Sequence, residues 1–247
     1  MAEPAPTMSQ PAAVDSEPAP VIVVTGTSRA ADPVTTMAAL IVGFHDEGLQ
    51  VCLSSVGANQ GRMLAAVQRL TGATRTYPPW ATLGSRSATP AEPNGRPAAP
   101  MPVQAATWSQ LSRHDGTDVL LVLDPHGLAM PIDAEGATVL DLMETAGSLG
   151  LRIGVVLACD ATPDTLRQAA LVAAALRPVR ADLLGSVLAP SEADQRPIPP
   201  VAPWAHVVAG QVSAVTGAPV LGGLPDGAAS WPPQQFRDRA GAWLPVR

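Results

Sequence analysis

The stretch from Val21 to Val51 has the layout of a strand, a phosphate-binding loop and a helix. Val21–Thr25 is a continuous apolar run, which predicts a buried strand. Asp32 followed by Pro33 is typical of a helix N-cap and first turn, so we expect a helix from there to about Glu47. A loop of this kind binds phosphate through glycine, lysine and a hydroxyl residue at the start of the helix, whereas this chain has Asp32, Pro33 and Val34 there.

Each of these three residues opposes phosphate binding for a separate reason. Asp32 places a negative charge at a helix N-terminus, where the phosphate would lie. Pro33 removes a backbone N–H donor, and Val34 offers no oxygen to Mg²⁺. All 15 basic residues of the chain are arginine, so no lysine elsewhere can supply the missing amine.

Composition excludes several classes of function. The formal net charge of −6 and the pI near 5.1 argue against a nucleic-acid partner. No apolar run is long enough to cross a bilayer and no basic, then apolar leader opens the chain, so we expect a cytoplasmic protein without a membrane partner. Cys52 and Cys159 end apolar runs and are interpreted as buried free thiols.

The order of elements predicts the fold class. Apolar strands alternate with helices, which indicates an α/β three-layer sandwich: a mostly parallel central sheet with helices on both faces. We expect residues 1–20 to be a disordered Pro/Ala-rich tail and residues 21–247 to be one domain. A long irregular segment is predicted at about 73–102, with helices over 103–114, 133–150 and from about 162 to 176.

Several phrases of the sequence resemble the dethiobiotin synthetase family, the ATP-dependent enzymes of biotin synthesis. Val24, Thr25, Gly26 and Thr27 match the start of the family's V-T-G-T-x-T-x-V-G-K-T loop, and Ala38–Leu40 match its helix. The similarity extends over about residues 21–245 through the phrases "RTYPPWATLGSRSATPA", "GLAMPIDAEGATVLDLM" and "PVLGGLP". It implies a P-loop NTPase fold and a homodimer with the diaminopelargonate site near the subunit interface.

The family's functional positions are not kept. The lysine after the second strand falls on Leu53 or Ser54, and the glutamate of the E-G-A-G-G motif falls on Leu123. The acidic pair that helps to bind Mg²⁺ corresponds to Arg62 and Met63. In "DTLRQ" only the Thr and Leu of the family's G-T-[IL]-N-H motif remain. Core strands and turn glycines survive, so the resemblance predicts a scaffold with a degenerate nucleotide loop.

The candidate site residues form two groups. The remnant of the nucleotide loop comprises Gly26, Thr27, Ser28, Arg29 and Thr35. The hydroxyls of Thr25, Thr27 and Ser28 bind a ligand or close their own loop, and Arg29 reaches an anion or pairs with Asp32. Asp124, at the end of "DVLLVLD", is either a Mg²⁺ ligand or the start of a turn. His45, His114 and His206 have no metal-binding spacing, and we expect no catalytic residue.

Two functions follow as expectations. The first is a non-catalytic homologue, without a cofactor, that binds a protein partner or a small ligand and forms a homodimer or a mixed dimer with an active paralogue. The alternative is a divergent dethiobiotin synthetase that uses ATP and Mg²⁺, with catalysis resting on backbone amides, Arg29 and Asp124.

Overall fold

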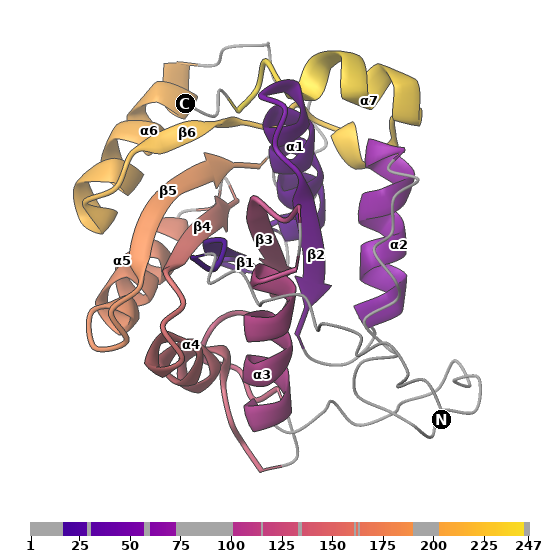
Figure 1. Ribbon diagram of the computed structural model, residues 1–247. Helices are drawn as coiled ribbons and strands as arrows, with labels where there is room; N and C mark the ends of the chain where they lie inside the picture. The colour runs from indigo at the N-terminus through magenta and orange to yellow at the C-terminus, as the bar shows by residue number, and fades with distance from the viewer. Residues whose placement is uncertain are drawn as a thin grey trace, which may run out of the picture.

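The computed structural model describes residues 17–28, 31–56, 60–72, 101–114, 116–132, 135–160, 162, 164–189 and 203–244 (Figure 1). In these ranges six strands form one sheet in the order β2-β3-β1-β4-β5-β6, and every pair is parallel. The strands are β1 (Val21–Gly26), β2 (Val51–Ser55), β3 (Val119–Leu123), β4 (Ile153–Cys159), β5 (Asp182–Leu188) and β6 (Val220–Gly223). The predicted α/β three-layer sandwich is confirmed.

Helices cover both faces of this sheet (Figure 1). One face carries α1 (Pro33–Asp46), α2 (Gln60–Thr71) and α7 (Pro233–Ala240). The other face carries α3 (Met101–Ser112), α4 (Val139–Ser148), α5 (Thr165–Leu176) and α6 (Pro203–Thr216). The sheet strands are apolar on both faces because both are buried, and β1, β3 and β4 are buried along nearly their whole length.

The helix that follows β1 begins as the sequence predicts. Asp32 is its N-cap and Pro33 is its first residue, where the missing N–H costs no helical hydrogen bond. The helix ends at Asp46, and Gly48 then adopts a φ of 80°, which a residue with a side chain rarely tolerates. Eleven residues of α1 are buried, so this helix is a central part of the core.

Three predicted helix boundaries are wrong. The helix expected over 133–150 begins only at Val139, because Thr138 and Asp141 form a reciprocal capping box that fixes its start. The helix expected at 103–114 is α3 and begins two residues earlier, at Met101. The helix expected from about residue 162 begins at Thr165, and its N-cap residue Asp164 makes no capping hydrogen bond.

The entry of the chain into the fold is described from Glu17. Within the range predicted as a tail, Ala19 is buried and its N–H donates to the Ser112 carbonyl at 2.8 Å. Residues 1–16 and 73–100 lie outside the described part of the chain, so the predicted tail and most of the predicted irregular segment are not tested.

Candidate functional site

The sheet has its topological switch point at β1. The chain leaves β1 for β2 and β3 on one side and later builds β4, β5 and β6 on the other side. The loops after β1, β3 and β4 therefore meet at the carboxyl edge of the sheet, where α/β proteins bind their ligands. Residues 26–28, 31–35, 124–127, 160, 162, 164 and 165 form the described part of this candidate site.

The N-terminus of α1 is already bound to an acid of the chain itself. The Asp32 carboxylate accepts a hydrogen bond from the Thr35 backbone N–H at 2.9 Å and another from the Thr35 hydroxyl at 2.5 Å. The Asp32 carbonyl accepts from the Thr36 N–H at 3.1 Å and from the Thr36 hydroxyl at 2.8 Å. Pro33 has no N–H to offer. The Asp32 carboxylate thus engages the Thr35 N–H and hydroxyl, two donors that a phosphate at this helix N-terminus would use.

The inside of the loop is filled as well. Ala31 is buried, and a Cβ built on Gly26 would lie 3.2 Å from the Ala31 Cβ and 3.7 Å from the Pro33 Cδ. The Ser28 carbonyl oxygen lies at the same 3.2 Å from this position. With the Asp32 carboxylate at the start of α1 and no N–H at Pro33, the described residues of this loop fit a nucleotide phosphate poorly.

Asp124 is a completely buried carboxylate at the end of β3. One of its oxygens accepts from the Thr25 hydroxyl at 2.7 Å, and the other accepts from the N–H groups of His126 and Gly127 at 3.1 and 3.2 Å. Burial raises the pKa of Asp124 above its ordinary value, although these hydrogen bonds oppose the shift. One oxygen closes the turn after β3 and the other binds Thr25 of β1, so a Mg²⁺ ion would have to displace these donors.

Asp160, directly after β4, ties the loop of β1 to the start of α5. Its carboxylate accepts from the Ser28 hydroxyl at 2.5 Å and from the Thr162 hydroxyl at 2.8 Å, and the Thr165 hydroxyl donates to the same group. Burial alone would raise the pKa of Asp160, but these hydrogen bonds outweigh it and lower the pKa. Asp160 therefore favours its ionised form and links the loop after β1 to the start of α5.

Two buried hydroxyls near this edge have no hydrogen-bond partner among the described residues. They are Thr27 Oγ1, after β1, and Ser55 Oγ, at the end of β2. A buried hydroxyl without a partner costs about 1–3 kcal/mol, so such groups in a native fold call for an explanation such as a bound water or ligand. Both atoms are therefore available to a bound water or ligand.

The structure places most of the predicted site residues together. Gly26 ends β1, Thr27 and Ser28 follow it in the loop, and Thr35 lies in the first turn of α1. The Ser28 hydroxyl binds Asp160 and the Thr35 hydroxyl binds Asp32. Arg29 lies outside the described residues, so its interaction with an anion or with Asp32 stays a prediction. Over the described ranges no cluster of three His, Cys, Asp or Glu side chains is arranged to hold a metal ion.

Sequence reasoning did not identify Asp160 as a residue of the site. The signal was present in the spacing Asp160, Thr162 and Thr165, because short hydroxyl side chains two and five residues after an aspartate often close a turn at a helix start. Its partner Ser28 is 132 residues distant in the sequence, and that contact has no local signature. Cys52 and Cys159 are buried free thiols, as predicted.

The fold with its loop after β1 defines the class of protein. The chain has the fold of the P-loop ATPases of the MinD and ParA type. It superimposes on the cell division ATPase MinD of Pyrococcus furiosus with a TM-score of 0.53, 18% identity and 88% of each chain covered. It superimposes on MinD of Pyrococcus horikoshii, solved with Mg-ADP, with a TM-score of 0.52, 16% identity and 91% of each chain covered. At these identities the likeness establishes the fold alone.

The sequence establishes the family. The chain is 32% identical over 235 residues to the ATP-dependent dethiobiotin synthetase BioD of Streptomyces coelicolor. The aligned region covers 91% of this chain and 92% of the relative. The chain belongs to the dethiobiotin synthetase family, as its sequence phrases predicted. No protein-family model matches it. In the described ranges, every helix falls short of the length and hydrophobicity needed to cross a membrane.

Proposed function

We propose that this member of the dethiobiotin synthetase family does not close the ring of diaminopelargonate and acts instead by binding a protein partner or a small ligand. The observation that carries the proposal is the Asp32 carboxylate on the Thr35 N–H and hydroxyl at the start of α1. A negative charge fixed at that position repels a triphosphate and occupies the donors that would hold it.

The absence of lysine supports the same proposal. Phosphoryl transfer depends on positioning and on cations that neutralise the charge of the transferred group. The chain has no lysine at the loop position or at the second lysine position of the family, which falls within β2. Asp124 has both oxygens engaged by Thr25, His126 and Gly127. Losing one stabilising donor costs about 10²–10³ in rate in well-studied sites, so several such losses together leave little catalysis.

The intact scaffold supports a role through association. The sheet and the helices on both its faces are complete over the described residues, although the loop chemistry is changed. Such a scaffold is suited to a homodimer or to a mixed dimer in which it regulates an active paralogue. Co-expression of differently tagged chains with an active synthetase tests this point, and recovery of homodimers alone would contradict the mixed dimer.

The alternative function is that of the relative, an ATP-dependent dethiobiotin synthetase. The 32% identity over nearly the whole of both chains favours it. In that case Mg²⁺ would displace a donor from Asp124. Catalysis would rest on Arg29 and on backbone amides of the loop, and Asp32 would have to move away from the Thr35 N–H to release it.

Calorimetric titration with ATP and Mg²⁺, in parallel with an active dethiobiotin synthetase, separates the two functions. We expect no saturable heat up to millimolar nucleotide and no dethiobiotin from diaminopelargonate, CO₂ and ATP. Saturable, Mg²⁺-dependent binding together with dethiobiotin formation would refute the proposal. Rescue of a strain that lacks the synthetase gives an independent check of the same point.

A further inference from the structure

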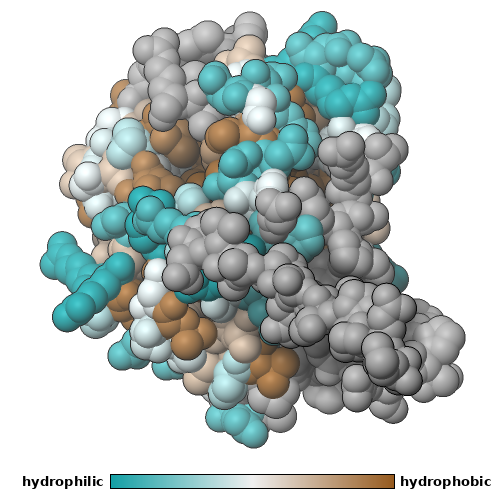
Figure 2. All heavy atoms as spheres, in the orientation of Figure 1, coloured by the Kyte–Doolittle hydropathy of each residue, from teal (hydrophilic) through white to brown (hydrophobic). Residues whose placement is uncertain are grey.

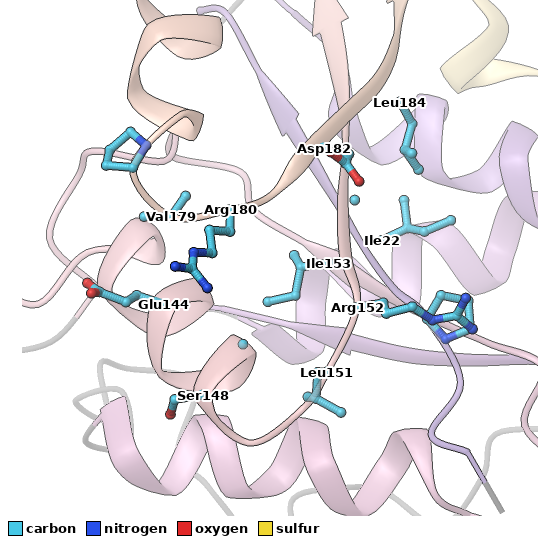
Figure 3. A pocket seen from close by; sticks show the side chains of 14 residues that line it. Ile22, Glu144, Ser148, Leu151, Arg152, Ile153, Val179, Arg180, Asp182 and Leu184 are labelled. Atoms are coloured by element: carbon cyan, nitrogen blue, oxygen red, sulfur yellow. The ribbon is translucent and has the colours of Figure 1, made fainter.

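An open cavity of about 890 Å³ lies at the amino edge of the sheet, away from the candidate site. Its walls come from the starts of β1, β4 and β5, from the C-terminal end of α4 and from the segment between α5 and β5. Ile22, Ile153 and Asp182 mark the strand starts (Figure 3). Because β1 has six residues, this edge is roughly 17 Å from the loop after β1.

The cavity joins apolar walls to charged groups. Leu151, Val179 and Leu184 belong to its lining, and Leu184 is 41% exposed although it lies on a strand of the central sheet. Figure 2 shows apolar surface over the part of the sheet formed by β5 and β6. Exposed apolar side chains on a sheet face are typical of a surface that another segment covers.

Arg180 is the unusual residue of this cavity. Its φ of 54° makes it the one described residue other than glycine with a left-handed backbone. That conformation costs roughly 1–2 kcal/mol for a residue with a side chain. Figure 3 shows its guanidinium reaching into the cavity in the direction of Glu144, yet no hydrogen bond or ion pair joins it to a described residue. The Arg180 residue is exposed, so its cation is accessible to an anionic group that enters the cavity.

The described chain begins at the rim of the same cavity. Glu17 forms an ion pair with Arg152, a lining residue, at 3.4 Å. Pro20 is part of the wall, and the Ala19 N–H bond to Ser112 fixes the chain between them. Residues 1–16 therefore start next to the cavity, and 16 residues in a polyproline II conformation span roughly 50 Å, more than enough to cross it.

We propose that the cavity at the amino edge of the sheet binds residues 1–16 of the same chain. This segment contains prolines at 4, 6 and 11, the larger apolar residues Met1, Met8 and Val14, and two acids, Glu3 and Asp15. Prolines lower the entropy lost when a segment is ordered in a groove. The apolar residues cover the walls near Leu184, and a carboxylate of the segment pairs with Arg180.

Tethering favours this occupant over a free ligand. The cavity is open, and Glu144 and Asp182 balance the charges of Arg152 and Arg180, so its attraction for a separate small molecule is weak. A segment attached at Glu17 is held at a local concentration in the millimolar range, at which weak contacts are sufficient. The pairing of Glu17 with Arg152 is the first contact of this docked segment.

Paramagnetic broadening in the full chain tests the proposal. A nitroxide is attached to a Ser9→Cys variant; the native cysteines, Cys52 and Cys159, are 2% and 0% exposed and stay unlabelled. We expect the amide signals of Leu151, Val179 and Leu184 to broaden strongly, while that of Met130, exposed in the loop after β3, does not. Uniform weak broadening over the whole surface would overturn the proposal.

Two controls complete the experiment. The Arg152→Met/Arg180→Met variant should reduce the broadening several-fold, whereas Arg177→Met, an exposed arginine of the same helix end outside the cavity, should leave it unchanged. Arg180→Gly removes the cation and relieves the backbone strain, so it should weaken docking in a chain that still folds. Broadening of an isotope-enriched, unlabelled chain by a spin-labelled, unenriched one would assign the cavity to a second copy and overturn the proposal.

Discussion

The carboxylate of Asp32 lies 2.9 Å from the backbone nitrogen and 2.5 Å from the hydroxyl oxygen of Thr35, so α1 begins on an acid of its own chain. In a nucleotide-binding relative of this fold, the ligand would supply the negative charge at that place. The helix is stabilised by Asp32 without a ligand.

Replacing this acid should weaken the fold. We expect Asp32→Ala to lower the free energy of unfolding by about 1 kcal/mol, because two hydrogen bonds of the cap are lost and Ala is a poor N-cap. Urea denaturation measures the loss. Glu47→Ala, at the opposite end of the same helix, is the matched control and should cause no loss; an equal loss in both variants would contradict a capping role.

Rebuilding the phosphate loop should create nucleotide binding. In Asp32→Gly/Pro33→Lys/Val34→Thr, the helix N-terminus regains free amides, a cation and a metal-binding hydroxyl. We expect saturable heat on titration with Mg²⁺ and ATP. The control Asp32→Ala/Pro33→Ala/Val34→Ala removes the same side chains without adding the new groups and should not bind. Failure of the rebuilt loop would show that other residues exclude the nucleotide.

The two buried aspartates of the site should affect pH dependence with opposite signs. The pKa of Asp124 is raised by burial, so its unfavourable contribution to stability grows as pH rises from its ordinary value of 3.8 through the folded value. The pKa of Asp160 is lowered, so its favourable contribution is present above 3.8 and is lost as pH falls through the folded value.

The corresponding amide variants test this prediction. Between 3.8 and neutral pH, the stability of Asp124→Asn relative to the unchanged chain should improve as pH rises. Below 3.8, Asp160→Asn should lose less stability on acidification than the unchanged chain. Thermal or urea unfolding over a pH series measures both slopes. Identical slopes in all three chains would show that neither pKa differs between the folded and unfolded states.

The left-handed backbone of Arg180 should make glycine favourable there. Arg180→Gly relieves the strain, and the larger entropy of the unfolded glycine variant offsets part of this gain, so we expect a net gain of about 0.5–1 kcal/mol in the free energy of unfolding. Arg177 has ordinary helical angles, with φ at −55°, and Arg177→Gly should lose a similar amount. Equal effects of both variants on the urea midpoint would contradict the strain at Arg180.

The two cysteines should react only after unfolding. Burial raises the pKa of Cys52 to about 11 and that of Cys159 to about 12, so little thiolate exists at pH 8 and both sulfurs are shielded from solvent. We expect a thiol reagent to label the native chain orders of magnitude more slowly than the urea-unfolded chain. Rapid labelling of one equivalent in native buffer would show that one of these thiols is accessible.

The fold could be predicted well from sequence where the signals are local. Asp32, Pro33 and Gly48 predicted both ends of α1, because capping and glycine conformations depend on neighbouring residues. The start of α4 was missed because the stretch from residue 133 offers more than one residue that could be the N-cap. The reciprocal pairing of Thr138 with Asp141 determines that Thr138 is the cap. Composition alone does not rank such alternative caps.

The site was predictable in its residues but not in its contacts. The loop position and the adverse residues Asp32 and Pro33 followed from the motif. The motif did not predict that Thr25 and Ser28 bind Asp124 and Asp160, which follow β3 and β4. These acids become neighbours of the loop only through the strand order β3-β1-β4. The left-handed Arg180 was not anticipated either, since arginine gives no local preference for that conformation.

The hydrogen bonds of Thr25 and Ser28, at the end of β1 and in the loop after it, have a consequence for the order of folding. Thr25 reaches Asp124 across 99 residues and Ser28 reaches Asp160 across 132 residues. Contacts of such high sequence separation pay a large loop-closure entropy and form only when the strands that carry them have assembled. The helix α1, with its local cap, can form early in the nascent chain. The loop before it acquires its closed shape late, after β3 and β4 have joined β1 from either side.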